Sequence, residues 1–420
     1  MTGPPVAHAT DDAPAVTPRP NPRLASHASR TGFDFDLARP DDPDDDRALR
    51  QVLADNPVPG RVWLSFEREP SYFAGCGTLG REWQVVIARQ RSVGRIVGLA
   101  CRATRLVYVN GEARELGYLS QLRVDRPFRG QWLTVRGFHY LRQLHDARPV
   151  EGYLAAITEE NQQARGLLVD RPRGHFPTFL EVARVETLAL VVRRQRARVT
   201  GSDGAVGVEG GRPEELPAIV AFLRERGRQR QFFPVYDDQD FAGAGAGAGA
   251  GARENPTTRG FRTEDFVVAR STGPRHEIVG VMGLWDQSAY RQTVVRGYGA
   301  TLGLFRGVLN LVARAAGVPC APFPDPGEHV AGAYASFVCI ARDDPRIFAR
   351  LLDHLHALAA QRGYAYLFLG LPAGDPLLAV ARRYPHLTYR SRLYIASWGN
   401  RTLYDRLDHR RLPYVDLATL

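Results

Sequence analysis

Apolar positions in the first half of the chain follow two different periods. Residues 33–37 alternate apolar and polar side chains, which is the period of a half-buried strand. Residues 118–124 form a short run of β-prone residues, and apolar side chains recur at helical spacing over 132–144. The polar and basic segment 125–131 separates these two patterns. The pattern therefore predicts a strand that enters a helix through a short loop.

The same two periods predict the other elements along the chain. Expected strands lie at 33–37, 84–88, 96–109, 113–124, 152–158, 179–192, 266–269, 278–284, 335–341, 364–369 and 387–398. Expected helices follow the caps at 41–44, span 132–144, begin at Asn161 and at Pro213, and span 304–316, 347–362 and 376–384. Because the two halves repeat one order of elements, we predict a tandem α/β protein with a mixed sheet and helices on both faces.

Composition shifts divide the chain into segments. Residues 1–30 are rich in Pro, Ala, Asp and Ser and predict a disordered tail. A first domain is expected over 31–192, and a basic, Gly-containing linker over 193–206. The second domain is expected over 207–420, with the Ala-Gly alternation at 242–252 as a flexible surface insertion.

Charge and composition exclude several function classes. All 55 basic residues are arginine and the net charge is +10, which suits an acidic ligand. The arginines are spread along the chain without zinc-finger spacing or an aromatic-basic repeat, so nucleic-acid binding is not expected. The arginine bias is typical of GC-rich bacterial coding sequences. No apolar run of about 18 residues and no signal pattern occurs, so we expect a cytoplasmic protein without a membrane span.

The four cysteines, Cys76, Cys101, Cys320 and Cys339, have no metal-like spacing, so reduced structural thiols and no metal site are expected.

The loop Asp125–Gln131 is the first candidate for a binding site. A strand that enters a helix through a basic loop with a glycine directs backbone N–H groups, and the positive end of the helix dipole, at whatever lies above the loop. The expected ligand is a phosphate or another anion.

The stretch Leu119–Leu144, with Gly152–Asp170 after it, resembles the acyl-CoA-binding core of the GNAT acetyltransferase superfamily. The loop motif of that superfamily is Arg or Gln, two residues, Gly, one residue, Gly or Ala, and Arg129 matches its first position. The resemblance implies a sheet with a splayed pair of strands, a loop that holds the CoA pyrophosphate, and acetyl-CoA or another acyl-CoA as the cofactor. The implied cofactor-binding residues are Leu122, Arg123, Val124, Arg129, Gly130, Gln131, Trp132, Leu133, Thr134 and, on the next helix, Asn161.

The loop departs from the superfamily motif at two positions. Trp132 stands where the first motif glycine belongs, and Thr134 where the second small residue belongs. The diphosphate could still approach if Trp132 turns into the core, or if Gly130 supplies the close approach in a shifted register. Leu168 takes the position where many members of the superfamily carry a tyrosine general acid.

The second half resembles the same fold more weakly. Its corresponding loop, Ile340–Arg346, has no glycine and carries Asp343 and Asp344 at the start of the next helix. These acids would cap the helix and repel a diphosphate. We therefore predict that the second half is degenerate, binds no CoA, and shapes the acceptor cleft or the domain interface.

Candidate catalytic groups are few. Glu115 lies on the strand before the loop, Glu159 and Glu160 end the next strand, and His175 lies on a loop near the expected cleft. Glu115, Glu159 and His175 are the candidate acids or bases, although a glutamate at such a position is more often a solvated rim charge. His139 and His145, on the 132–144 helix and just after it, are expected to be structural.

The polar and aromatic block Trp285–Gln292 has two alternatives. It is either a bulge or hairpin packed on the other half, or an acceptor-binding wall in which Arg291 or Arg296 binds a carboxylate.

The resemblance implies an acyl-CoA-dependent N-acyltransferase, most readily an acetyltransferase, that acts on a small-molecule or peptide amine. The alternative is a non-catalytic GNAT-like protein that binds CoA or another anion, or that has a regulatory role. The acceptor and the oligomeric state are left open.

Overall fold

The structure is a computed structural model that describes residues 32–58, 60, 62–130, 132–170, 176–193, 206–241, 255–299, 303–304, 307, 323–399 and 401–420. The expected tail at 1–30, most of the linker, the Ala-Gly stretch and most of the 304–316 helix lie outside these residues, as do Gln131, His175 and Cys320. The division of the chain at 31, 193 and 207 stays a prediction.

The described part of the first half contains seven strands and three α-helices, and all but one strand follow the predicted order. They are β1 (Phe33–Leu37), α1 (Pro43–Asp55), β2 (Val62–Glu67), β3 (Glu82–Gln90), β4 (Ile96–Val109), β5 (Glu112–Val124), α2 (Leu133–Ala147), β6 (Tyr153–Thr158), α3 (Gln162–Leu168) and β7 (Thr178–Val191). Helix α1 begins after Asp42, whose side chain accepts from Asp44 N at 3.0 Å, as the cap pattern predicts. Strand β2 was not expected.

The described part of the second half repeats this order. Its elements are β8 (Val206–Gly210), α4 (Leu216–Gly227), β9 (Phe266–Ser271), β10 (Ile278–Trp285), β11 (Gln292–Tyr298), β12 (Gly332–Ile340), α6 (Pro345–Gln361), β13 (Tyr366–Pro372), α7 (Leu378–Ala381), β14 (His386–Ser397) and α8 (Thr402–Arg406). Asp344 caps α6 by accepting from Arg346 N at 2.8 Å, as predicted. Asp343 does not cap the helix. Its Oδ1 lies 2.5 Å from Arg230 Nη2, and Arg230 also binds Asp375.

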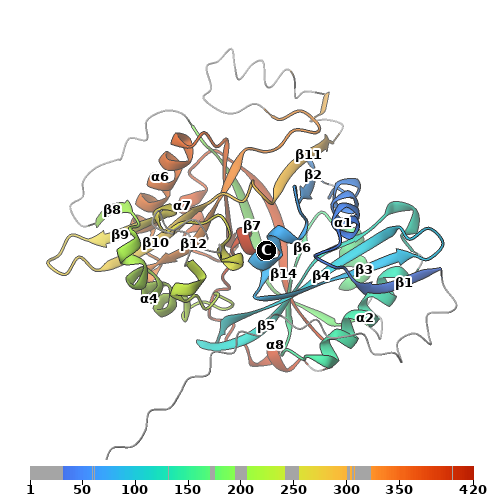
Figure 1. The fold of residues 1–420 in the computed structure, drawn as a ribbon. Helices are drawn as coiled ribbons and strands as arrows, with labels where there is room; N and C mark the ends of the chain where they lie inside the picture. The colour runs from blue at the N-terminus through green and yellow to red at the C-terminus, as the bar shows by residue number, and fades with distance from the viewer. Residues whose placement is uncertain are drawn as a thin grey trace, which may run out of the picture.

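One twelve-stranded sheet runs through both halves, in the order β1-β3-β4-β5-β6-β14-β7-β13-β12-β10-β9-β8 (Figure 1). The last strand of each half lies beside strands of the other half. Strand β14 pairs with β6 and β7, and β7 pairs with β14 and β13. In Figure 1, β7 and β14 therefore lie between the two lobes of the molecule. The sequence pattern predicts these strands but not their exchange.

A second, two-stranded sheet also joins the halves. Strand β11 pairs antiparallel with β2, with Val294 opposite Ser65. The Trp285–Gln292 block therefore connects β10 to a strand that packs on the first half, rather than forming a hairpin of its own. Arg296 of β11 binds Glu67 of β2, Nε to Oε1 at 2.9 Å, so this guanidinium already holds a carboxylate. Arg296 is thus not the reader of an acceptor carboxylate that one alternative expected.

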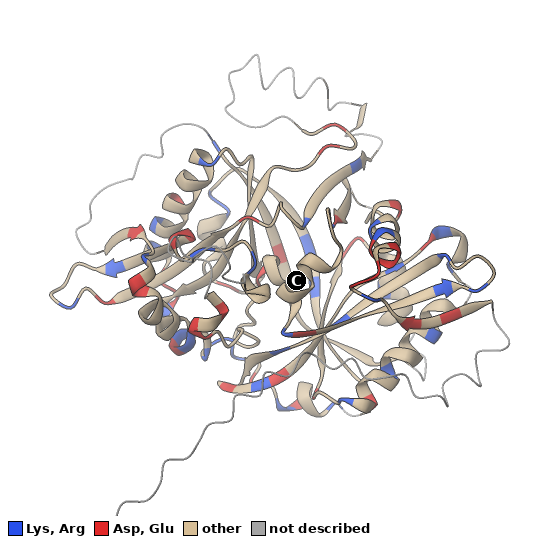
Figure 2. Cartoon of the chain, viewed as in Figure 1, with Lys and Arg blue, Asp and Glu red and all other residues tan. Residues whose placement is uncertain are grey.

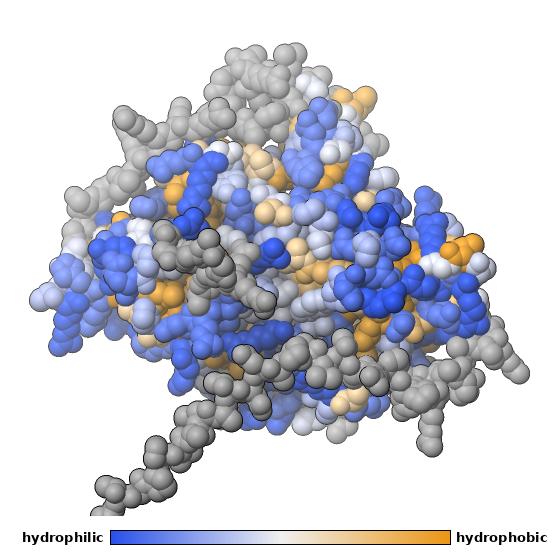
Figure 3. Space-filling model, viewed as in Figure 1, coloured by the Kyte–Doolittle hydropathy of each residue, from blue (hydrophilic) through white to orange (hydrophobic). Residues whose placement is uncertain are grey.

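Helices cover both faces of the sheet, as predicted, because side chains alternate along each strand. In β3, Val85 and Ile87 pack in one core cluster with α1, whereas Val86 packs in another with α2. In the other lobe, α6 and α4 cover opposite faces in the same way. Arginines and acids are interspersed over the described elements, and apolar side chains form small separate patches on the face shown (Figures 2 and 3). No helix within the described ranges is long and apolar enough to cross a membrane.

Candidate functional site

Strand β5 carries a bulge just beyond its last pair with β6. Ser120 pairs with Cys101 of β4, and the next paired residues are Arg123 and Leu99, so Gln121 and Leu122 stand opposite a single residue. Gln121 has a φ of 57°. In a bulge the extra residue leaves the ladder, and its backbone groups can bind something else. The bulge therefore offers main-chain N–H groups beside the strand.

Strands β5 and β6 separate next to this bulge. They pair in parallel at Gly117 with Tyr153 and at Tyr118 with Leu154, and no further pair joins these two fully described strands. Gly117 allows the close contact, because a Cβ there would lie 2.0 Å from the Tyr153 ring. The two strands then diverge and leave a gap in the sheet.

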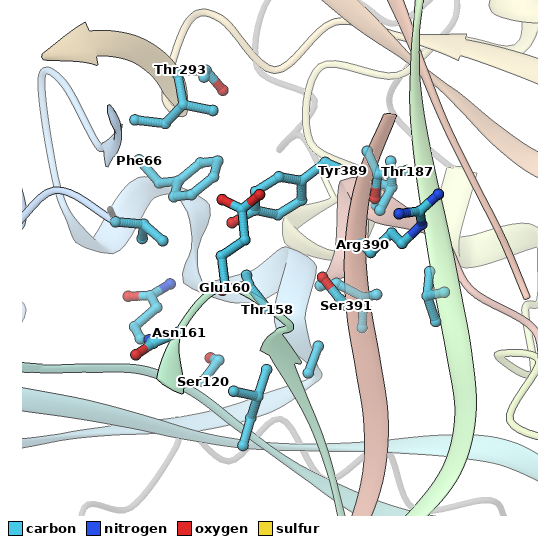
Figure 4. A pocket seen from close by; sticks show the side chains of 18 of the residues that line it. Phe66, Ser120, Thr158, Glu160, Asn161, Thr187, Thr293, Tyr389, Arg390 and Ser391 are labelled. Atoms are coloured by element: carbon cyan, nitrogen blue, oxygen red, sulfur yellow. The ribbon is translucent and has the colours of Figure 1, made fainter. Parts of the chain in front are cut away.

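The gap opens into a cavity of about 1850 Å³ between the two lobes. This volume exceeds the roughly 300–1,000 Å³ that is typical of a small-molecule site. Both halves supply its walls. The first half contributes residues of α1, β2, β4, β5, α2, β6, α3 and β7, and the second half contributes residues of β11, β12, β13, β14 and the last residues of the chain. Figure 4 shows Glu160, Phe66 and Tyr389 pointing into this space.

Two buried hydroxyl groups flank the gap. Ser120 Oγ of β5 and Thr158 Oγ1 of β6 line the cavity. Ser120 interacts with the Cys101 thiol, and Thr158 with the Tyr389 hydroxyl. A hydroxyl has one donor and two acceptor lone pairs, so both groups can also bind a ligand in the gap.

The charged side chains that line the cavity differ in their partners. Glu159 accepts from Arg392 Nε at 3.1 Å, and Arg390 lies 3.8 Å from Glu186. Glu160 forms no ion pair or side-chain hydrogen bond with a described residue, and its carboxylate points into the cavity (Figure 4). Glu160 is therefore the uncompensated carboxylate of this wall.

Arg123 lines the cavity and forms no ion pair with a described residue. Its only side-chain hydrogen bond within the described chain is from Nη1 to the carbonyl of the preceding Leu122, at 3.0 Å. Burial lowers the pKa of this guanidinium below its ordinary value. Arg291, by contrast, donates to main-chain oxygens of the last residues, including Leu420 at 2.7 Å. Arg291 thus holds the end of the chain against the cavity.

A buried polar cluster lies behind the bulge. The Arg68 guanidinium donates to the carbonyl of Tyr72 at 3.1 Å and to Cys76 Sγ at 3.3 Å. With its amide oxygen turned toward Arg68, Gln121 accepts from this guanidinium and donates to the Tyr72 hydroxyl at 2.5 Å. Burial would raise the pKa of the Cys76 thiol, but its hydrogen bond with Cys101 and the Arg68 charge lower it below its ordinary value. The cluster therefore anchors the strained Gln121 conformation.

Tyr389 of β14 brings a phenol into the same space as Arg123 and Glu160. Burial raises the pKa of this hydroxyl, the Glu160 charge adds to the effect, and the positive charge of Arg123 opposes it. The ring thus lies within electrostatic range of both uncompensated groups. Strand β14 delivers Tyr389 from the second half to the end of β6.

The loop after β5 is braced from below. Arg129 donates from Nε to the carbonyl of Val124 at 2.9 Å and from Nη2 to Asn56 Oδ1 at 2.8 Å. Asn56 in turn donates to Asp125 Oδ1 at 2.8 Å. Gly130 has a φ of 82° and open space where a Cβ would be, so its backbone is approachable.

Trp132 does not enter the core, which corrects one of the two sequence alternatives. Its side chain is 65% exposed, and it adopts a φ of 59° as the residue before α2. Leu133, which is 3% exposed, is instead the first core residue of the helix. Trp132 gives no side-chain hydrogen bond to the first turn of α2. The alternative in which Gly130 supplies the close approach stays a prediction.

The structure brings some of the remaining candidates to the cavity and not others. Leu122 and Asn161 line it, and Asn161 also caps α3 by accepting from Ala164 N at 3.0 Å. Glu115 does not line it, since this residue lies at the other end of β5 and contacts Arg148 at 3.4 Å. His145 is structural, with Nδ1 3.1 Å from the Tyr153 hydroxyl. The candidates in the loop and at the start of α2 do not line the cavity. They are Val124, Arg129, Gly130, Trp132, Leu133 and Thr134.

Sequence reasoning missed Tyr389, Arg390, Phe66 and Thr293 as cavity residues. The alternation of polar and apolar side chains in β14 predicts a strand but does not reveal which strand lies beside it.

Comparison with known proteins bears on the fold. No protein-family model matches the chain, and no curated protein matches it in sequence. A crystal structure of Saccharomyces cerevisiae N-myristoyltransferase with bound myristoyl-CoA matches with a TM-score of 0.56 and 11% identity, over 92% of this chain and 86% of the other. A second structure of that enzyme matches with a TM-score of 0.58 and 10% identity, over 88% of this chain and 80% of the other.

A shorter match comes from a fungal multi-domain GH3 β-N-acetylglucosaminidase. Its GCN5-related glucosamine N-acetyltransferase region gives a TM-score of 0.54 and 15% identity, over 86% of this chain and 38% of the other. At these identities the similarity concerns the fold. The predicted fold class, a mixed α/β sheet built from tandem GNAT-like units, is confirmed.

Proposed function

We propose that this chain is an acyl-CoA-dependent N-acyltransferase. The observation that carries the proposal is the gap between β5 and β6, which lies beside a bulge and opens into a cavity shared by both halves. At the far end of β5, a loop with an approachable glycine precedes a helix whose first turn has no side-chain cap. This order suits a long donor with a diphosphate at the loop and a thioester at the bulge.

The residues around the gap suit such a donor in their chemistry. Ser120 Oγ and Thr158 Oγ1 are buried hydroxyls that line the gap, and the pantetheine arm of CoA carries amide groups that could hydrogen-bond to them. Gly130 and the start of α2 would hold the diphosphate. Arg129 supports this loop through Val124 and Asn56, so we assign it a positioning role.

The transfer needs little beyond alignment and a base. The amine nitrogen attacks the thioester carbonyl, an N–C bond forms, the C–S bond breaks, and the leaving thiolate takes up a proton. Main-chain N–H groups at Gln121 and Leu122 would stabilise the developing oxyanion, because the bulge leaves them outside the ladder. Glu160 would accept the proton that the amine releases, since its carboxylate has no partner within the described residues and faces the cavity. Glu159, which binds Arg392, suits this role less well.

The cavity favours an acyl group longer than acetyl. Its second-half wall includes an aromatic group, Tyr334, Tyr366 and Phe368, and Phe368 pairs with Ala189 of β7. An acetyl group has a single methyl and would leave this wall without contacts, whereas a longer chain would bury apolar surface there. The yeast N-myristoyltransferase that shares the fold was solved with bound myristoyl-CoA, which agrees with this proposal.

Two measurements test the proposal together. Isothermal titration with CoA, acetyl-CoA and longer acyl-CoAs measures donor binding, and release of free CoA thiol over a panel of amines measures transfer. We expect binding of acyl-CoA and amine-dependent thiol release. Binding without amine-dependent release would favour the non-catalytic alternative, and absence of binding would contradict both.

A further inference from the structure

Two side chains of opposite charge line the cavity without being paired. Arg123 and Glu160 form no ion pair with each other and none with another described residue. Most other charged groups of the wall are neutralised, as Arg392 binds Glu159 and Arg390 lies near Glu186. Arg123 is half-buried and Glu160 is exposed at the cavity, so a ligand can reach both charges without displacing a protein partner. The cavity therefore suits a ligand that carries both charges.

Arg123 points to the face of the sheet that α1 covers. It stands opposite Leu99, and opposed residues of an antiparallel pair point to the same face. Leu99 packs with α1, whereas Leu122 packs with Phe138 and Leu141 of α2. Arg123 thus faces the compartment under α1 and β2. It is also two residues ahead of the loop that would hold the diphosphate.

Tyr389 lines the same cavity as Arg123 and Glu160. Glu160 and Tyr389 both point into the cavity that Arg123 also lines (Figure 4). The opposite effects of the Glu160 and Arg123 charges on the pKa of the Tyr389 hydroxyl agree with this placement. Glu160 is also the proposed acceptor of the amine proton. An amine held by Glu160 would therefore have a cationic guanidinium in the same compartment.

We propose, on the basis of the proposed acyltransferase function, that the acceptor is an amino acid, with its ammonium group on Glu160 and its carboxylate on Arg123. The guanidinium presents a planar set of donors that matches a carboxylate. An amine without an acid group, or a peptide whose first carboxyl is an amide, would leave Arg123 without its anion. The choice of an amino acid as the acceptor thus follows from the charge of Arg123, which no described carboxylate neutralises.

The test uses matched acceptors with the acyl-CoA that gives the fastest thiol release. The pairs are glycine and glycinamide, L-leucine and L-leucinamide, and L-phenylalanine and L-phenylalaninamide. We expect kcat/KM for the acid to exceed that for the amide about 10- to 100-fold in at least one pair, the range of a hydrogen-bonded charge. In Arg123→Gln this ratio should fall toward one, and Arg123→Lys should restore part of it. Arg47→Gln, a paired surface arginine of α1, controls for loss of charge and should keep the ratio.

Three results would overturn the proposal. The first is a wild type that prefers no acid over its amide, and the second is an Arg123→Gln variant that keeps the preference. The third is an Arg123→Gln variant that binds CoA itself at least about tenfold more weakly, because Arg123 would then hold a phosphate. If no amine gives thiol release, the acyltransferase proposal fails separately. Calorimetric titration of the same acids and amides then tests the acceptor proposal. Binding of an acid that is lost in Arg123→Gln would support it. Equal binding of the acids and their amides would contradict it.

Discussion

Arg392 Nε lies 3.1 Å from Glu159 Oε1, although 233 residues separate these two side chains in the sequence. Arg392 is on β14, and Glu159 follows β6, the strand beside it. The pair shows how the exchanged last strand completes the site. Strand β14 neutralises Glu159, leaves Glu160 uncompensated and brings Tyr389 to the same wall.

This arrangement predicts different roles for two adjacent glutamates. Glu160→Gln should lower kcat for amine-dependent thiol release by about 10²- to 10⁴-fold, because the variant lacks the group that takes the amine proton. Glu159→Gln is the matched control, and its effect should be much smaller, since Glu159 is held by Arg392. Steady-state kinetics with both variants makes the comparison. The reverse order of effects would assign the base to Glu159.

The loop after β5 predicts where the donor diphosphate binds. Gly130→Asp should weaken CoA affinity by about tenfold or more, because a carboxylate would stand next to the diphosphate at the start of α2. Gly94→Asp is the control, since Gly94 also has a left-handed φ, 70°, with open space around it, but lies in the turn between β3 and β4. Calorimetric titration with CoA measures both variants. Equal affinities in the two would place the diphosphate elsewhere.

His145 predicts part of the pH dependence of stability. Burial lowers the pKa of this imidazole, which contacts the Tyr153 hydroxyl. In the unfolded chain the group binds a proton more readily, so the stability that it contributes is present above the ordinary pKa of about 6.5 and is lost as the pH falls through the lower folded value. Between about pH 7.5 and pH 5.5, the fall in Tm should therefore be smaller in His145→Gln than in wild type.

His139→Gln serves as the control for this comparison, because His139 is on the same helix with an exposed side chain. Thermal unfolding followed by circular dichroism at the two pH values gives one difference in Tm for each of the three proteins. A fall in Tm that is unchanged in His145→Gln would show that burial of this imidazole does not contribute.

Local pattern predicts much of the fold because its signals are contained in short segments. Strand β4 has the predicted bounds, Ile96–Val109, and the Asp42 cap marks the start of α1. The β2–β11 pair was missed because nothing within either segment identifies its partner; Arg296 and Glu67 are 229 residues apart. The same holds for β14, whose neighbours β6 and β7 come from the other half.

The site was predictable only in part, for a similar reason. The bulged strand, the loop and Asn161 form one continuous stretch, so a motif could indicate them. The roles of Arg129 and Trp132 depend on a bond to Asn56, 73 residues away, and on a left-handed φ of 59°. The charges that define the acceptor compartment, at Arg123 and Glu160, are recognisable only once their lack of partners is known.

The central claim is that one cavity between the two halves holds the acyl group of an acyl-CoA. Ala189 of β7 lines the cavity beside the second-half wall, since it pairs with Phe368 of β13, so Ala189→Phe would fill that end. Ala147→Phe is the control, because Ala147 is the last residue of α2 and is exposed.

The most direct measurement is therefore the acyl-chain-length profile of CoA thiol release, from acetyl-CoA to palmitoyl-CoA, for wild type and both variants. We expect wild type to prefer a chain longer than acetyl, and Ala189→Phe to lower kcat/KM for the preferred chain by about tenfold or more while it shifts the optimum to shorter chains. Thiol release that is absent with every donor, or a profile that Ala189→Phe leaves the same as in Ala147→Phe, would contradict the claim.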